Sequence, residues 1–186
     1  MSSHLATILT LADLSLAEMC SARLDGQLFT IGDFWCPIDE VDDAEHRAHA
    51  LALLGSSRLI IERASAAWVY GDAAEPTVHE FCLNAHTRSR LGDSARVVIR
   101  QGHCPTERTQ QISGVAVTRP LHTAVDLARF SGQPPELLLP VLQRLLHRAG
   151  PDALARARQE CHNPEGPTTA LALTRLTEAA DLTGPT

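Results

Sequence analysis

The chain has 186 residues, of which 44% are hydrophobic, and a formal net charge of −6. This length suits one domain, or one domain with a small appendage, and no stretch approaches the roughly 18 consecutive apolar residues of a membrane helix. The N-terminal segment has no basic start and carries Asp13 and Glu18 among its apolar residues, so we expect no signal peptide and a cytoplasmic location.

Charge is distributed unevenly and divides the chain into three segments. Residues 1–45 hold nine acidic residues against Arg23 alone, a net charge of −8, whereas residues 46–130 hold ten arginines and seven acidic residues. Residues 131–186 are nearly neutral at −1. We interpret the three segments as an acidic N-terminal region, an α/β core and a helical C-terminal region. The first two must bind different partners or face each other.

The acidic region has the outline of a degenerate winged helix. Two short helices are predicted over 4–12 and 15–24, the second with Ser15 and Glu18 spaced as a capping box. The stretch "LDGQLFTIGDFWCPID" then predicts two short strands around a Gly-Asp turn.

The middle segment alternates helices and strands. We expect a helix over 44–54, a short extended "SSRLII", and a helix over "ERASAAWVYG" that ends at Gly71. Strands follow in "TVHEFCL" and in "ARVVIR", which places Arg96 and Arg100 on one face. "TQQISGVAVT" predicts a hairpin around Ser113-Gly114. With three further helices at about 135–148, 151–160 and 168–181, the fold class is α/β of the α+β type: a small mixed sheet packed by helices and a helical tail.

The helix that follows the hairpin carries a polar stripe. Pro120 suits the first turn, Thr118 is placed to cap it, and Leu121, Val125 and Ala128 are expected to face inward. On a helical wheel the four polar side chains fall within about 80° of one another. They are Arg119, His122, Asp126 and Arg129. Two interpretations stay open: a solvated face with local ion pairs, or a face that binds a partner.

Four consecutive stretches also resemble a known family. "RASAAWVYG", "TVHEFCL", "ARVVIR" and "ISGVAVTRPLHTAVDLAR" are similar, in order and spacing, to the AbiEi-family antitoxins of type IV toxin–antitoxin systems. The resemblance covers about residues 46–130 and, more loosely, the helix-turn-helix-like region that precedes them. It departs from the family at His122, where many relatives carry arginine.

The resemblance implies an antitoxin whose partner is a nucleotidyltransferase-like toxin encoded by the neighbouring gene. The predicted contact residues are Arg119, His122, Asp126, Arg129, Arg96 and Arg100. Relatives often repress their own operon through a winged helix, but a region at −8 is repelled by phosphates, which disfavours DNA binding here. We hypothesise instead that the acidic region covers a basic cleft of the toxin.

Covalent inactivation of the toxin by an atypical serine kinase is the alternative. The chain contains no lysine, no Gly-rich loop and no H-R-D motif, which excludes an orthodox protein kinase. An atypical enzyme could hold ATP and Mg²⁺ through Arg88, Arg90, Arg96, Arg100 and Arg119, with Asp126 or Asp93 as base or metal ligand. Without that activity no cofactor is expected.

Other potential sites are weaker. His46 and His49 beside Glu45 could chelate a metal, but a solvated helix face is the favoured interpretation, so no metal site is predicted. The five cysteines have no Cys-x-x-Cys pair, and we expect reduced, packed thiols. Ser65 lacks a G-x-S-x-G context and is expected to be an ordinary helix residue.

Overall fold

The chain folds into helices and short strands in a computed structural model that describes residues 8–55, 58–84, 96–161 and 169–182. The α+β fold class is confirmed. The described helices are α1 (Leu16–Leu24), α2 (Ala44–Leu53), α3 (Arg63–Val69), α4 (Pro120–Phe130), α5 (Pro135–Ala149), α6 (Ala153–Cys161) and α7 (Thr169–Asp181), with a 3-10 turn η1 at Thr106–Arg108. The strands are β1 (Leu28–Ile31), β2 (Phe34–Pro37), β3 (Ile60–Ile61), β4 (His79–Asn84), β5 (Val97–Gly102), β6 (Thr109–Ile112) and β7 (Val115–Thr118).

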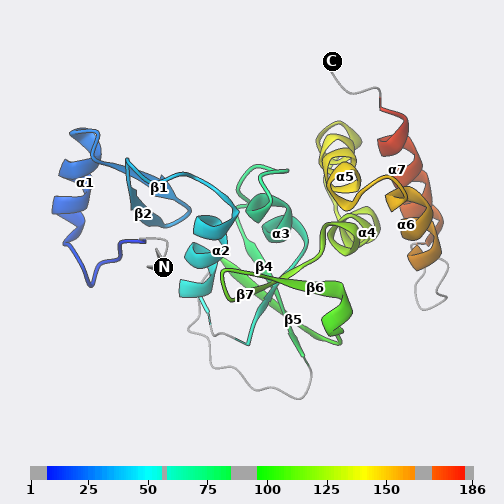
Figure 1. The fold of residues 1–186 in the computed structure, drawn as a ribbon, viewed down its shortest axis with the longest axis horizontal. Helices are drawn as coiled ribbons and strands as arrows, with labels where there is room; N and C mark the ends of the chain where they lie inside the picture. Colours follow the sequence, from blue (N-terminus) through cyan, green and yellow to red (C-terminus); the bar gives the residue numbers. More distant parts are fainter. Residues whose placement is uncertain (1–7, 56–57, 85–95, 162–168, 183–186) are drawn as a thin grey trace.

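One helix and a hairpin form the acidic N-terminal end of the molecule (Figure 1). Ser15 and Glu18 make the predicted capping box of α1, and β1 pairs with β2 around Gly32. The helix predicted over 4–12 is wrong within the described residues 8–12, because Leu9 instead pairs with Trp35 through two backbone hydrogen bonds. The winged-helix outline is therefore not confirmed.

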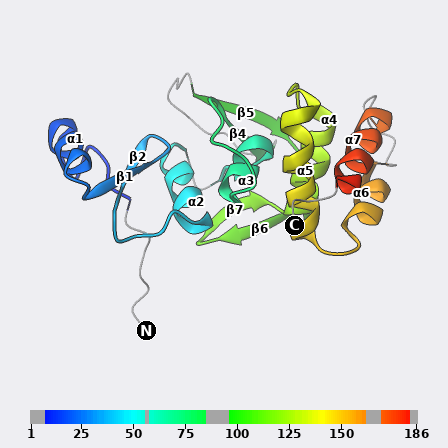
Figure 2. The same cartoon turned by 90° about the horizontal axis from the view of Figure 1, so that it is seen from above.

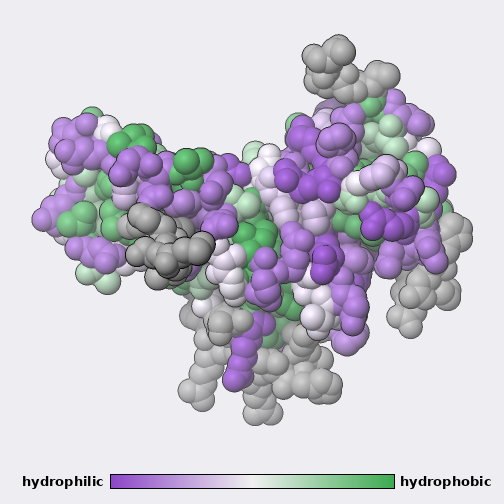
Figure 3. Space-filling model, in the orientation of Figure 1, coloured by the Kyte–Doolittle hydropathy of each residue, from purple (hydrophilic) through white to green (hydrophobic). Residues whose placement is uncertain are grey.

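Apolar side chains remain exposed among the acidic ones at this end. Figure 3 shows them as separate green patches over α1 and the neighbouring hairpin. They include Leu16, Leu24, Ile38 and Val41, whereas Met19 is the buried residue of α1. This end therefore presents a surface that is both acidic and partly apolar.

The central sheet has five strands in the order β5-β4-β3-β7-β6. β3 runs antiparallel to β4 and parallel to β7, while β4 and β5 form a parallel pair at one edge. Helices α2 and α3 pack against the sheet, and Figure 2 shows the C-terminal helices at the opposite end from the acidic region.

The hairpin β6–β7 turns as predicted through Ser113 and Gly114. Both residues have positive φ, 46° and 83°, as the two-residue turn requires for strands with the usual twist. The turn lies next to α2, where the Ser113 hydroxyl donates to the Glu45 carboxylate at 2.7 Å. The basic middle and the acidic region thus meet in part.

Helix α4 lies at the centre of the packed helices. It contacts α3, α5, α6 and α7, and one hydrophobic cluster runs from Ile31 to Ala179 through all three segments of the chain. Seven of the eleven residues of α4 are buried, whereas the sequence predicted only three on its inner face. Among the described residues, no helix is long and apolar enough to cross a membrane.

Candidate partner-binding groove

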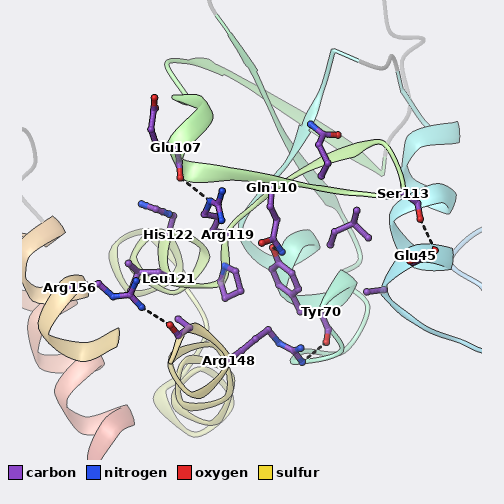
Figure 4. A pocket seen from close by; sticks show the side chains of 15 residues that line it. Glu45, Tyr70, Glu107, Gln110, Ser113, Arg119, Leu121, His122, Arg148 and Arg156 are labelled. Carbon is purple, nitrogen blue, oxygen red and sulfur yellow. Dashed lines mark hydrogen bonds between the residues drawn. The ribbon is translucent and has the colours of Figure 1, made fainter. Parts of the chain in front are cut away.

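A groove of about 760 Å³ opens where the hairpin, the start of α4 and the end of α5 meet (Figure 4). α2 lies at one end of it and α6 at the other. Its side chains come from segments that are distant in sequence. They are Ala44, Glu45, Tyr70, Glu107, Gln110, Gln111, Ile112, Ser113, Arg119, Pro120, Leu121, His122, Arg148, Ala149 and Arg156.

Arg119 is held at the groove by the chain that precedes α4. Its amide donates to the Arg108 carbonyl at 2.8 Å, and its Nε donates to the Glu107 carbonyl at 3.0 Å. It is the N-cap residue of α4, so the predicted capping by Thr118 is wrong. The Thr118 hydroxyl instead lies 2.7 Å from that of Thr123. Arg119 is exposed, and its Nη groups extend beyond these backbone contacts.

Two further arginines reach the groove from α5 and α6. Arg148 is neutralised, because its Nε lies 2.8 Å from the Asp72 carboxylate and its Nη2 also donates to the Tyr70 carbonyl. Arg156 is exposed and donates through Nη2 to the Ala149 carbonyl. In the described part of the chain, neither Arg119 nor Arg156 has a carboxylate within ion-pair distance.

Tyr70 forms the floor near the middle of the groove. Its hydroxyl donates to the Thr118 carbonyl at 2.6 Å and accepts from the Gln110 side chain at 3.1 Å. Burial raises the pKa of Tyr70, so the phenol stays protonated. The floor is thus uncharged and fixed by hydrogen bonds.

His122 lines the groove with little access to solvent, its side chain being 12% exposed. Burial, reinforced by the Arg108 guanidinium, lowers its pKa, so the ring is neutral near pH 7. Its Nδ1 has no hydrogen-bond partner among the described residues, while Nε2 lies 3.9 Å from Glu160. The prediction that His122 lies on an exposed stripe is therefore wrong.

Asp126 also contradicts the exposed stripe. It is 8% exposed, and its carboxylate meets the Arg108 guanidinium at the long distance of 3.5 Å. Burial raises its pKa, because the charged form loses water that this one ion pair replaces only in part. Arg129 is half-buried and donates to the Glu160 carbonyl. The stripe fails because α4 has neighbours on nearly every side.

The predicted strand arginines are engaged in ion pairs away from the groove. Arg96 pairs with Asp33 of the acidic hairpin and with Glu75 at 2.9 Å. Arg100 holds the buried Glu62 carboxylate with both Nε, at 3.0 Å, and Nη2, at 2.6 Å. Hydrogen bonding to Glu62 raises the pKa of Arg100 further, so its charge is permanent.

The remaining predicted positions do not form a second site. Asp93, like Arg88 and Arg90, lies outside the described residues. His46 is buried against Asp43 and Glu40 and is not on a solvated face, and the described residues contain no cluster suited to a metal ion. Ser65 is a helix residue, as predicted, whose hydroxyl accepts from the Glu80 amide at 2.9 Å.

Comparison with known proteins agrees with the resemblance noted from sequence. The family model of the AbiEi antitoxin C-terminal domain matches residues 59–173, from just before β3 into α7. No curated protein gives a significant match. The crystal structure of the RV2827C protein from Mycobacterium tuberculosis is similar with a TM-score of 0.38 and 19% identity, covering 87% of this chain and 69% of that one.

Proposed function

Because this chain belongs to the AbiEi antitoxin family, we propose that it silences a nucleotidyltransferase-like toxin by binding it through the groove between the hairpin and α6. Membership in the family makes it an antitoxin of a toxin–antitoxin pair. The nature of the toxin and the use of the groove are the parts we propose.

One observation carries the proposal. Arg119 and Arg156 have exposed guanidinium groups that line the same groove, and within the described residues each side chain donates only to a backbone carbonyl. Most other arginines described above have a carboxylate partner. Two uncompensated cations beside a large concave surface are typical of a place where a ligand or partner supplies the missing charge.

The test is co-expression with the product of the neighbouring gene, followed by purification and intact-mass measurement. Binding predicts a stable complex without nucleotide and rescue of growth that requires stoichiometric antitoxin. A phosphorylating enzyme instead predicts rescue at low dose, dependence on ATP and Mg²⁺, and about 80 Da added to the toxin, the mass of one phosphoryl group. An unmodified toxin that does not co-purify would refute binding.

The charge of the acidic region supports a second contact with the toxin, which we assign to those of its acidic side chains that have no partner of their own in the described part of the chain. Seven of its nine acidic residues have a hydrogen-bond or ion-pair partner within the protein: Asp13, Glu18, Asp33, Glu40, Asp42, Asp43 and Glu45. Asp25 and Asp39 are exposed and have no such contact within the described residues. They lie near the exposed Leu24 and Ile38.

Deleting residues 1–45 is a poor test, because Ile31 and Cys36 belong to the main hydrophobic cluster. The double variant Asp25→Asn/Asp39→Asn leaves that core intact. If the acidic region contacts a basic surface of the toxin, the variant should associate more slowly, and the difference should shrink at high salt. A toxin association rate equal to wild type at low salt would end this hypothesis.

DNA binding by the acidic region is the remaining alternative. It predicts a salt-sensitive gel shift of the chain's own promoter fragment. The region has a net charge of −8 with Arg23 as its one arginine, and the nearby Arg47 and Arg96 are paired with its Asp42 and Asp33, so few cations are left for phosphates.

A further inference from the structure

We propose that the groove takes an acidic polypeptide segment of the partner, with one of its carboxylates held between Arg119 and Arg156. This inference rests on the proposed antitoxin function and adds the chemistry of the contact. It makes Arg119 and Arg156 the residues that fix the orientation of the bound segment.

The first argument comes from the unused donors. Arg119 donates through Nε to the Glu107 carbonyl, and Arg156 donates through Nη2 to the Ala149 carbonyl. Each of these backbone contacts anchors a guanidinium and leaves other N–H groups for a ligand. A guanidinium presents a planar fork that matches the two oxygens of a carboxylate.

The second argument comes from their placement. Arg119, His122 and Arg156 gather at one end of the groove, and Glu45 and Ser113 lie at the other (Figure 4). Both arginines are close enough to His122 to affect its ionisation. Glu107 lies at this end too, but its side chain points away from Arg119 and His122 (Figure 4), so an anion placed between the arginines meets two cations and a neutral imidazole. An anion at the other end meets the Glu45 carboxylate.

The third argument concerns the lining between these ends. The half-buried Ile112, Pro120 and Ala149 provide apolar surface along the groove, to which Tyr70 and Leu121, each 8% exposed, add little. A segment with apolar side chains followed by an acidic residue therefore matches the groove in order. Such a segment buries apolar area along the floor and its charge at the basic end.

Nucleic acid fits this groove less well. Its successive phosphates would run past Glu45 and Glu107, which stand on the rim, on a chain whose net charge is −6. A polyanion gains affinity by contact with many cations, and only one end of the groove offers them. A polypeptide with a single acidic end avoids this repulsion.

Photo-crosslinking with the complete antitoxin–toxin complex tests the location. Benzoylphenylalanine is placed at Gln111, which is exposed and lines the groove, or as a control at Gln101, which is exposed on β5 at the opposite edge of the sheet. The proposal expects a crosslink from Gln111 to a toxin peptide that contains aspartate, glutamate or the C-terminal carboxylate. A crosslink at Gln101 only would overturn it.

Charge reversal tests the chemistry. Arg119→Glu/Arg156→Glu should weaken the toxin complex about tenfold or more, since each substitution removes a charge-assisted contact and adds repulsion. Arg58→Glu/Arg158→Glu is the matched control, because both arginines are exposed, lie outside the groove and outside the acidic region, and change the net charge equally. The control should stay within about twofold of wild type.

The outcomes separate the two proposals. If Arg119→Glu/Arg156→Glu binds the toxin with wild-type affinity and has an unchanged melting temperature, the acidic-segment inference is overturned and toxin binding stands. Displacement of the toxin by a short single-stranded RNA at physiological salt would assign the groove to nucleic acid instead. A wild-type chain that forms no complex at all refutes the proposed binding mechanism, and this inference with it.

Discussion

The ion pair between Glu62 and Arg100 gives the sharpest prediction about stability. The Glu62 carboxylate is 1% exposed and precedes α3, and Arg100 reaches it from β5 through two hydrogen bonds of 3.0 and 2.6 Å. Glu62→Gln keeps the size of the side chain and removes its charge. One amide N–H₂ must then face the guanidinium, where no acceptor exists.

The expected cost follows from the burial of the two partners. Removing one partner of a fully buried pair costs about 3–5 kcal/mol, because the other charge is left without solvent. Here the Arg100 side chain is 40% exposed and recovers part of its hydration. We therefore expect a loss of about 2–3 kcal/mol. For a chain of this length that corresponds to a decrease in melting temperature of about 5–10 °C.

Asp33→Asn is the matched control, again an acid-to-amide change beside an arginine. The side chains of Asp33 and Arg96 are 43% and 41% exposed, so this pair should contribute about 0–1 kcal/mol and less in 1 M salt. Urea denaturation of both variants at low and high salt measures the difference. If Glu62→Gln costs no more than Asp33→Asn, or if salt removes its effect, the argument from burial is wrong.

Three further predictions follow from single contacts. Asp126→Asn should stabilise the fold at pH 7. Burial raises the pKa of Asp126 above its unfolded value of 3.8, so the wild type loses stability as the pH rises from 3.8 through the pKa of the folded state. Urea titrations at several pH values should therefore show the advantage of asparagine shrinking at acid pH. Tyr70→Phe loses the bond to the Thr118 carbonyl and should cost about 1–2 kcal/mol by denaturation, with no effect expected if the hydroxyl were solvated. Gly114→Ala should cost about 1 kcal/mol from its φ of 83° alone, since a Cβ there meets no atom within 4 Å; an unchanged midpoint would contradict the turn geometry.

Local signals in the sequence predicted most elements because each depends on neighbouring residues. The pair Ser15 and Glu18 caps α1 as spaced, Gly71 ends the turn after α3, and Ser113-Gly114 reverses the chain. Residues 8–12 are the exception. Their apolar spacing suits a helix, but Leu9 gains two backbone hydrogen bonds to Trp35, a contact that no local pattern encodes.

The polar stripe of α4 shows how a helical wheel misleads when a helix has several neighbours. The wheel predicts Leu121, Val125 and Ala128 inside, and all three are buried. Thr123, Ala124 and Leu127 are buried too, because α5, α6 and α7 cover the other sides. Small and apolar residues around the whole circumference were the available signal. That pattern predicts a helix surrounded by others. Asp126→Arg would then disrupt the core, because Asp126 is buried.

The groove could be predicted only in part, since it assembles from five distant segments. The pattern of α4 indicates Arg119 and His122, and both line the groove. Tyr70 and Arg156 reach the same groove only after the sheet and the C-terminal helices have packed. Nothing in the spacing of α6 distinguishes Arg156 from Arg158, which instead donates to Thr177.

The exclusive use of arginine explains how a cation can be both fixed and available in this fold. The one ammonium nitrogen of a lysine must bind both the carbonyl and any ligand, whereas an arginine can donate to the carbonyl through one nitrogen and to a ligand through the other two. Arg144 and Arg148 use this capacity to tie α5 to Asp72 within the protein. Arg119 and Arg156 have the same anchoring to the backbone, but within the described residues neither has a carboxylate at ion-pair distance. Replacing them by lysine should therefore preserve charge yet loosen its position, and a weaker toxin complex in Arg119→Lys/Arg156→Lys would show that geometry, as well as charge, holds the partner.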